Sequence, residues 1–170
     1  MTQIIDLMKS RYSERRFDPD KSVEEAKISQ LLEAARIAPT ASNRQAFRIY
    51  LLEGERGKEI MSNFNAPMHI VLTQVEEEAW QRREDCFNAA ALDIGIIGAH
   101  IVLAAEELGL KTCLICAFNV AELTKNLSLP PEEYPILAVA IGYASSTSAP
   151  GPRHTARKPL TDLLRPIPCD

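Results

Sequence analysis

The sequence predicts an α+β protein in which helices flank a mixed β-sheet. The chain has 170 residues, of which 46% are apolar, and this is enough for the hydrophobic core of one domain. Short apolar segments typical of strands alternate irregularly with amphipathic helical segments, which favours a sheet covered by helices. One long segment, residues 86–108, is apolar almost all round, and a helix without a polar face must be buried. We therefore expect residues 1–170 to form a single domain.

Local signals predict the elements of the N-terminal half. A short amphipathic helix is expected at residues 2–9, where four apolar side chains cluster. Ser22 and Glu25 have the spacing of a capping box, so a second helix should begin there and end before Pro39. The other elements expected in this half are a strand at 47–52, a turn at 54–57, a short helix near 58–62, a strand at 69–73 and a weakly helical segment at 76–84.

The C-terminal half begins with the long apolar helix at residues 86–108. Gly109 should end this helix, because glycine favours the left-handed conformation that follows a helix C-terminus. The helix carries several small residues that permit close approach of another helix, so we expect it to form a dimer interface. Asn119 and Glu122 predict the start of a further helix. The remaining elements expected are a strand at 112–118, that helix up to residue 127, a strand at 136–141 and a surface tail from residue 145.

The net charge of −4, from 19 basic and 23 acidic residues, argues against a general nucleic-acid-binding protein. Positive charge is concentrated near the two ends of the chain, around residues 11–16 and 153–165. Arg11, Ser13 and Arg15 alternate, so in an extended segment they point to one side and could bind an anion. Taken alone, this cluster is better explained as a solvated charged surface than as an anion site. A fold that brings both ends together would instead form one basic pocket.

The expected location is the cytoplasm, with free thiols. The N-terminus lacks the basic region and continuous apolar stretch of a signal peptide, and no segment predicts a membrane span. Four cysteines in a chain of this length do not suggest a secreted disulfide framework.

Several residues have both a chemical and a structural interpretation. Cys113 and Cys116 form a C-x-x-C pattern, but they lie in an apolar strand pattern, which favours buried core thiols over a redox or zinc site. His69 and His100 lack evident acidic partners and are interpreted as packing residues. Asp93 lies within the apolar helix and needs a partner, for which we favour a structural role. No metal site is expected.

The ordered set of motifs resembles the FMN-dependent nitroreductase family, of which the chain would be a short member. Residues 11–17 (RYSERRF) resemble the motif R-x-S-x-R-x-F, and residues 33–45 (EAARIAPTASNRQ) resemble E-A-A-x-x-A-P-S-x-x-N-x-Q. Residues 103–118 (LAAEELGLKTCLICAF) resemble L-A-A-x-x-L-G-L-G-x-C followed by I-G-A-F. Residues 141–143 (IGY) and 157–160 (RKPL) match the closing motifs.

The resemblance implies an intertwined homodimer with a nitroreductase-like sheet and an FMN molecule in each of two interface sites. Arg11 and Ser13, with Arg157 and Lys158, would hold the FMN phosphate and ribityl chain, while Arg15 would lie near flavin N1. The backbone at Cys116 and Ala117 would approach flavin N5. The residues expected to bind FMN are Arg11, Tyr12, Ser13, Arg15, Pro39, Thr40, Ala41, Ser42, Asn43, Cys116, Ala117, Arg157 and Lys158, of which 39–43 would come from the partner subunit.

The chain departs from the family pattern at three places. Ala46 and Phe47 replace the usual Pro-Trp, and Cys116 replaces the usual glycine. Residues 62–86 are short where longer relatives carry helices that cover the substrate. Trp80 and Phe64 are therefore only candidates for the wall of the substrate pocket.

The activity implied is that of an FMN-dependent NAD(P)H oxidoreductase. Hydride would pass through flavin N5 to a nitroaromatic, quinone or enone acceptor by a ping-pong mechanism. The cofactor carries this chemistry, so no catalytic acid or base is required of the chain. One alternative is an FMN-binding carrier or sensor without nicotinamide-dependent turnover. Another is a thiol or metal protein built on Cys113 and Cys116.

Overall fold

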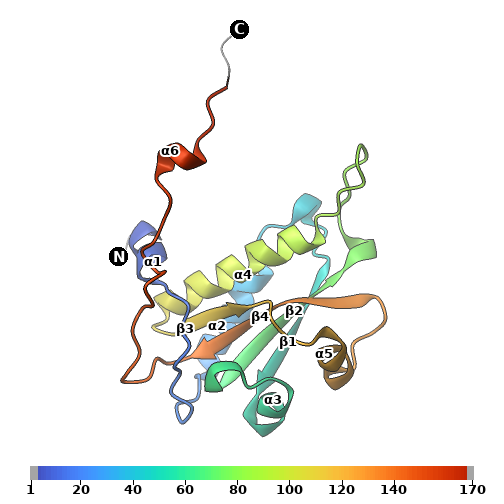
Figure 1. Cartoon of the computed structure of the whole chain (residues 1–170). Coiled ribbons are helices and arrows are strands. Elements are labelled where there is room, and N and C mark those ends of the chain that lie inside the picture. The colour runs from blue at the N-terminus through green and yellow to red at the C-terminus, as the bar shows by residue number, and fades with distance from the viewer. Residues whose placement is uncertain (1–3, 168–170) are drawn as a thin grey trace.

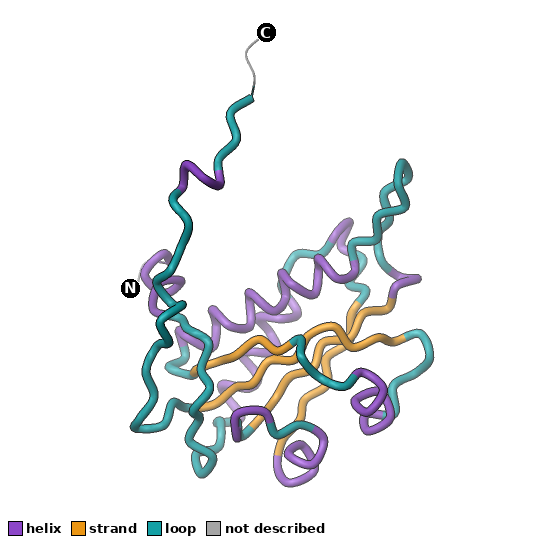
Figure 2. The backbone as a smooth tube through the Cα atoms, viewed as in Figure 1, coloured by secondary structure: helices purple, strands orange, loops and turns teal. Residues whose placement is uncertain are grey.

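The computed structural model describes residues 4–167, which form a four-stranded sheet with helices on both faces (Figures 1 and 2). The strands are β1 (Phe47–Glu53), β2 (Met68–Val75), β3 (Lys111–Ile115) and β4 (Glu133–Gly142), in the spatial order β1-β2-β4-β3. All three strand pairs are antiparallel, so the expectation of a mixed sheet is wrong for these strands. Parallel pairing among the described residues is confined to an isolated bridge between Ser13 and Thr112, at the edge of β3.

Alternating side chains of the central strand β2 build two separate cores. Ile70 and Leu72 pack with α2 and α4, whereas Val71 faces the opposite core beside α3 and α5. Because both faces are covered, β2 is buried along nearly its whole length, including its polar residues His69 and Thr73. The helices are α1 (Ile4–Ser10), α2 (Glu25–Arg36), α3 (Gly54–Ile60), α4 (Ala90–Glu107), α5 (Val120–Leu127) and α6 (Leu160–Leu163). No helix within residues 4–167 has both the length and the apolar character needed to cross a membrane.

The N-terminus of α2 differs from the prediction. The helix begins at Glu25 and its N-cap residue is Glu24, with no side-chain cap, so the expected capping box at Ser22 is wrong. Glu24 instead accepts a hydrogen bond from the Tyr143 hydroxyl at 2.6 Å and forms an ion pair with Lys27 at 3.6 Å. A tertiary contact with the end of the sheet therefore replaces the local cap. At α5 the local signal holds, since the Asn119 side chain accepts from the backbone N–H of Glu122 at 3.2 Å.

The starts of α3 and α4 also differ from the prediction. The segment expected as a turn at 54–57 is the first part of α3, because Gly57 allows the helix to approach β1 closely. A Cβ atom at Gly57 would lie 2.6 Å from the carbonyl carbon of Leu52. The long helix begins at Ala90 rather than at residue 86. The preceding residues form a projecting β-arm that is paired at Gln81 and Asn88.

Two further expectations need adjustment, and one holds. Strand β3 ends at Ile115, three residues before the predicted end. The segment at 76–84 is helical only as a short 3-10 turn, Glu76–Glu78, after which the chain enters the β-arm. Gly109 follows α4 with a φ of +73°, as expected for a residue just past a helix C-terminus. Residues 2 and 3 of the first predicted helix, and Cys169, lie outside the described residues.

One face of α4 is uncovered in the single chain. Ile94, Ile97 and Ile101 are buried against the sheet and α2, whereas the opposite face presents small and apolar residues to solvent. Leu92 on this face has 56% of its surface exposed. The neighbouring helix α1 also exposes its apolar residues Ile4, Ile5 and Met8. An exposed apolar surface of this kind is typical of an interaction site.

His69 in β2 provides a pH-dependent test of the fold. The side chain is 1% exposed, and burial lowers the pKa of His69 to about 4, although a hydrogen bond with the backbone of Asn63 favours the charged form. The folded state therefore keeps His69 neutral, while the unfolded chain binds a proton below about pH 6.5. Stability should fall as the pH drops through this window, by about 2 kcal/mol between pH 7 and pH 5.

Urea unfolding at both pH values measures this effect. His69→Gln should remove most of the difference, whereas His100→Gln, at a half-exposed position of α4, should retain it. An equal pH dependence in the wild-type protein and His69→Gln would contradict the buried neutral state of this residue.

Candidate functional site

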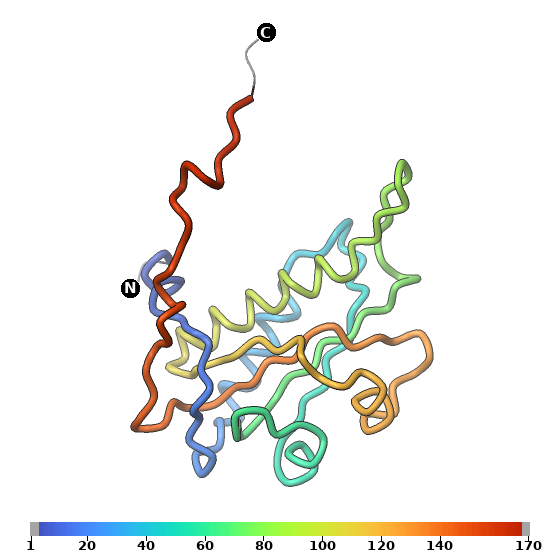
Figure 3. The backbone as a smooth tube through the Cα atoms, viewed as in Figure 1, coloured from blue at the N-terminus to red at the C-terminus, as the bar shows by residue number. Residues whose placement is uncertain are grey.

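The basic N-terminal segment is held in an extended conformation between β3 and the chain that follows β4. The backbone N–H of Glu14 donates to the Thr112 carbonyl at 2.9 Å. On the other side, Phe17 forms a bridge with Ala144, and the N–H of Ser145 donates to the Arg16 carbonyl at 2.8 Å. These contacts place the N-terminal segment beside the chain that follows β4 (Figure 3). Arg153 and Arg157 of the C-terminal basic cluster are thereby brought to the N-terminal arginines, whereas Lys158 and Arg165 are not among the residues that line the same cavity.

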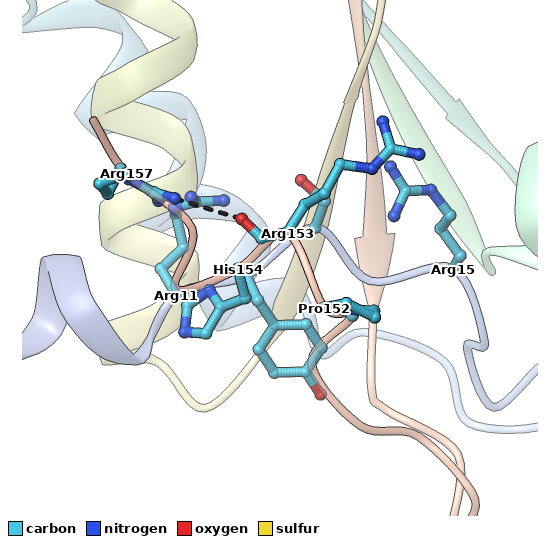
Figure 4. Close-up of a pocket in the computed structure, with 9 residues that line it drawn as sticks. Arg11, Arg15, Pro152, Arg153, His154 and Arg157 are labelled. Atoms are coloured by element: carbon cyan, nitrogen blue, oxygen red, sulfur yellow. Dashed lines mark hydrogen bonds between the residues drawn. The ribbon is translucent and has the colours of Figure 1, made fainter.

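Where the ends meet, they enclose a cavity of about 260 Å³ (Figure 4). Arg11, Ser13 and Arg15 all line it, in agreement with their alternation in the sequence. None of the nine lining residues, all from the described chain, carries a carboxylate, so the cavity suits an anion. The lining residues are Arg11, Tyr12, Ser13, Arg15, Gly151, Pro152, Arg153, His154 and Arg157.

The buried carboxylate of Glu14 holds together the chain segments that line this cavity. Its side chain is only 2% exposed and accepts four hydrogen bonds. Two come from the backbone N–H groups of Arg15 and Arg16 at 2.8 Å each, and two from the hydroxyls of Tyr12 and Ser148. Burial opposes the charge of Glu14, but these hydrogen bonds outweigh it and lower the pKa of Glu14. The carboxylate thus joins the N-terminal segment to the C-terminal tail.

The loop at residues 39–43, which was expected to contribute to the FMN site, lies at the opposite end of α4 from the basic cavity. The N–H of Ala41 donates to the Asp93 carboxylate at 3.0 Å, in the first turn of α4. The basic cavity lies near the other end of α4, where Lys111 pairs with Glu106 and lies over the Tyr12 ring. Asp93 and Glu106 are 13 positions apart, which corresponds to roughly 20 Å along the helix. A single chain therefore does not bring this loop to the cavity.

The same loop has an unusual backbone. Ser42, Asn43 and Gln45 have φ values of 51°, 53° and 53°, in the left-handed region that non-glycine residues rarely adopt. Asp93 is 3% exposed and supports this conformation through its hydrogen bond to Ala41. The partner expected for Asp93 is thus the backbone of this loop, while its second carboxylate oxygen is buried without a hydrogen-bond partner in the described residues. Strained backbone of this kind is concentrated at functional sites.

The two cysteines of the C-x-x-C pattern have different environments. Cys113 is buried in β3, and burial raises the pKa of its thiol, so the neutral thiol predominates at neutral pH. Cys116 is exposed just after β3, so the expectation of two buried thiols is wrong for this residue. Ala117 lines a second cavity, of about 270 Å³, between α3 and α5. Within residues 4–167, no three His, Cys, Asp or Glu side chains are grouped so as to hold a metal ion.

Sequence reasoning missed several residues that shape the basic cavity. Arg153 and His154 line it, although no motif marks them, and Ser148 belongs to its support through Glu14. Lys158 was expected in the site but is not among the lining residues. The only sequence signal for Arg153 was its position in the basic C-terminal tail.

The nitroreductase family model matches residues 8–64 and 62–143. The chain belongs to the nitroreductase family. The predictions of this family and of an oxidoreductase are therefore confirmed, as is the nitroreductase-like α+β fold. The chain is 32% identical to a nitroreductase family protein of Clostridium difficile 630, with a TM-score of 0.88 over 97% of this chain and 98% of that one.

More distant relatives have named activities. The chain is 24% identical to an NADPH-dependent oxidoreductase of Staphylococcus haemolyticus, over 88% of this chain and 69% of that protein. It is also 24% identical to the CLA biosynthesis enone reductase of Lactiplantibacillus plantarum, over 95% of this chain and 94% of that protein.

Proposed function

We propose that this nitroreductase family member is an FMN-dependent NAD(P)H oxidoreductase with a flavin site in the basic cavity. The observation that carries the proposal is the convergence of arginines from both chain ends on a cavity whose lining has no acidic residue. When bound, FMN would accept hydride from NAD(P)H and pass it to an acceptor. The residues of this chain would bind the cofactor, orient it and set its electrostatic environment.

The lining residues suit the phosphate end of FMN. Arg11 and Arg157 present guanidinium groups that can donate paired hydrogen bonds to phosphate oxygens, and Ser13 adds a hydroxyl. A phosphate monoester carries close to two negative charges at neutral pH, which these two cations would balance. Of the two tail residues expected at the phosphate, Arg157 lines the cavity and Lys158 does not. The phosphate-binding role is therefore proposed for Arg157.

Arg15 would lie beside the ring system of the flavin, which is the redox end of the cofactor. It lies on the side of the cavity away from Arg11 and Arg157 (Figure 4), and its guanidinium is 6.0 Å from the centre of the Phe64 ring. A cation held here would stabilise the negative charge that develops on reduction. Phe64 has a φ of +61°, so this aromatic neighbour is itself held in a strained turn. Phe64 therefore remains our candidate for a wall of the substrate pocket, and the exposed Cys116 and Ala117 lie just past β3.

A homodimer would complete the site. The uncovered apolar face of α4 offers an interface, and the strained loop at residues 39–43 lies about one helix length from the cavity of its own chain. If two copies pack across α4 about a two-fold axis, the loop of each approaches the cavity of the other. The tail beyond the cavity also exposes Leu160, Leu163 and Leu164, which could pack on a partner.

Disruption of this interface should abolish cofactor binding. Leu92→Glu places a charge in the exposed apolar face of α4 and should yield a folded monomer that no longer retains FMN. Light scattering with absorbance detection measures mass and flavin together. Tyr134→Glu alters an exposed residue of β4, away from α4, and should leave the dimer intact. A yellow Leu92→Glu monomer would contradict the shared site.

The activity is tested by the visible spectrum of the purified protein and by anaerobic mixing with NADH or NADPH. We expect a bound FMN spectrum that bleaches with at least one nicotinamide and recovers on addition of a nitroaromatic, quinone or enone. Bleaching under photochemical reduction alone would favour the second candidate, an FMN carrier or sensor. The exposed thiol of Cys116 at the expected flavin edge is the observation that favours that candidate. A colourless protein that binds no added FMN would overturn both.

A further inference from the structure

Arg153 lies in the cavity without an evident role in phosphate binding. Figure 4 shows the four arginines in two pairs, with Arg11 and Arg157 together at one side of the cavity. On the other side, the side chains of Arg153 and Arg15 extend toward one another. The cavity therefore has two cationic ends, each built from one N-terminal and one C-terminal arginine.

The position of Arg153 is fixed by its neighbours in the tail. The guanidinium of Arg157 donates to the carbonyls of Arg153 at 3.2 Å and Ala156 at 2.7 Å. The N–H of His154 donates to the Gly151 carbonyl at 2.9 Å, which closes a tight turn. Arg153 thus extends from an ordered turn, with its own backbone tied to the arginine at the opposite end of the cavity.

The pair formed by Arg15 and Arg153 has no neutralising partner in the chain. Neither arginine forms an ion pair with a carboxylate in the described residues. The Glu14 carboxylate accepts from two backbone N–H groups and two hydroxyls, and from no guanidinium. Two like charges that extend toward one another repel, and an anion placed between them relieves that repulsion. A negatively charged ligand group is therefore favoured between Arg15 and Arg153, in addition to a phosphate group at Arg11 and Arg157.

We propose that Arg153 is a second cation at the redox end of the flavin site, and that it acts with Arg15 to bind reduced FMN in preference to oxidised FMN. This inference rests on the proposed function. On two-electron reduction the flavin ring takes up a hydride and can carry a negative charge at N1, whereas the phosphate charge does not change. Arg11 and Arg157 would therefore bind both redox states equally, and only Arg15 and Arg153 would distinguish them.

The test compares the affinities for oxidised and reduced FMN in matched variants. Arg153→Gln should lower the preference for reduced FMN about tenfold, which corresponds to a fall of about 30 mV in the reduction potential of the bound flavin. Arg11→Gln removes a cation of the phosphate end that makes no contact with Arg153, so it should weaken both affinities in parallel and leave the potential unchanged. Arg153→Lys keeps the charge and should restore most of the potential.

Arg165→Gln is the matched control. Arg165 lies in the same tail, but its guanidinium donates to the carbonyls of Asp162 and Leu164, outside the cavity. This variant loses the same charge and should show wild-type potential and affinity. Thermal unfolding of each apo-protein separates loss of fold from loss of selectivity.

A wild-type potential in Arg153→Gln would overturn the inference. So would a parallel loss of both affinities, which would assign Arg153 to the phosphate, or an effect confined to the KM for NADPH or an anionic acceptor, which would assign it to a substrate. These outcomes leave the proposed function intact. By contrast, a wild-type protein that binds no FMN would remove the proposed function itself.

Discussion

Replacement of both Arg11 and Arg157 by glutamine is expected to weaken FMN binding about a thousandfold. These residues come from opposite ends of the chain and line the same cavity, where neither pairs with a described carboxylate. Each would supply charge-assisted hydrogen bonds to the phosphate, and these are the strongest hydrogen bonds that side chains make. Because they would share one ligand group, the two single variants need not add up to the double variant.

Fluorescence titration of the apo-protein with FMN measures this loss. The matched control replaces Arg83 and Arg165, two arginines outside the cavity, by glutamine and should retain wild-type affinity. The apo-proteins should unfold at similar temperatures, because Arg11 makes no hydrogen bond through its side chain in the described structure and Arg157 bonds only within the tail. An affinity within threefold of wild type in the Arg11 and Arg157 double variant would exclude phosphate binding at this cavity.

Glu14→Gln is expected to lower both the stability and the FMN affinity of the protein. Each carboxylate oxygen of Glu14 accepts two hydrogen bonds, and a glutamine amide would direct its NH2 group at two of those four donors. The hydroxyls of Tyr12 and Ser148 can turn to accept from that NH2 group, but the backbone N–H groups of Arg15 and Arg16 lose a charged acceptor. The loss of these charge-assisted bonds should reduce the free energy of unfolding by about 2 kcal/mol. Because Glu14 joins the N-terminal segment to Ser148, the arginines of the cavity should also lose their alignment.

The control for this variant is Glu107→Gln, an equal charge change at an exposed position of α4. Denaturant unfolding and FMN titration of both proteins give the comparison. Since the pKa of Glu14 is lowered in the folded state, its contribution is present above about pH 4.5 and is lost as the pH falls further. Glu14→Gln should therefore differ least from wild type in acid. Equal stability of the two variants at neutral pH would contradict the structural role of Glu14.

The parts of the fold that follow from local signals could be predicted from the sequence. Asn119 caps α5 and Gly109 ends the long helix, because each effect depends on the chemistry of one residue and its nearest neighbours. The start of α2 could not be predicted in this way. Its decisive contact joins Glu24 to Tyr143, which lies 119 residues further along the chain.

In the candidate site, too, the local pattern could be predicted from the sequence and the tertiary contacts could not. The alternation of Arg11, Ser13 and Arg15 indicated a shared face, and they line one cavity. The roles of Glu14 and Arg153 could not be read from the sequence, because they depend on how the tail lies against the N-terminal segment. An acidic residue within a basic cluster looks like surface charge until its four donors are known.

The comparison of FMN with riboflavin tests the central claim most directly. Riboflavin has the same ring system but lacks the phosphate, so it keeps every contact at the redox end and loses those at Arg11 and Arg157. If the two ends of the chain form a phosphate site, the apo-protein should bind riboflavin at least about a hundredfold more weakly than FMN. Equal affinity for the two ligands would show that the basic cavity does not hold the cofactor phosphate.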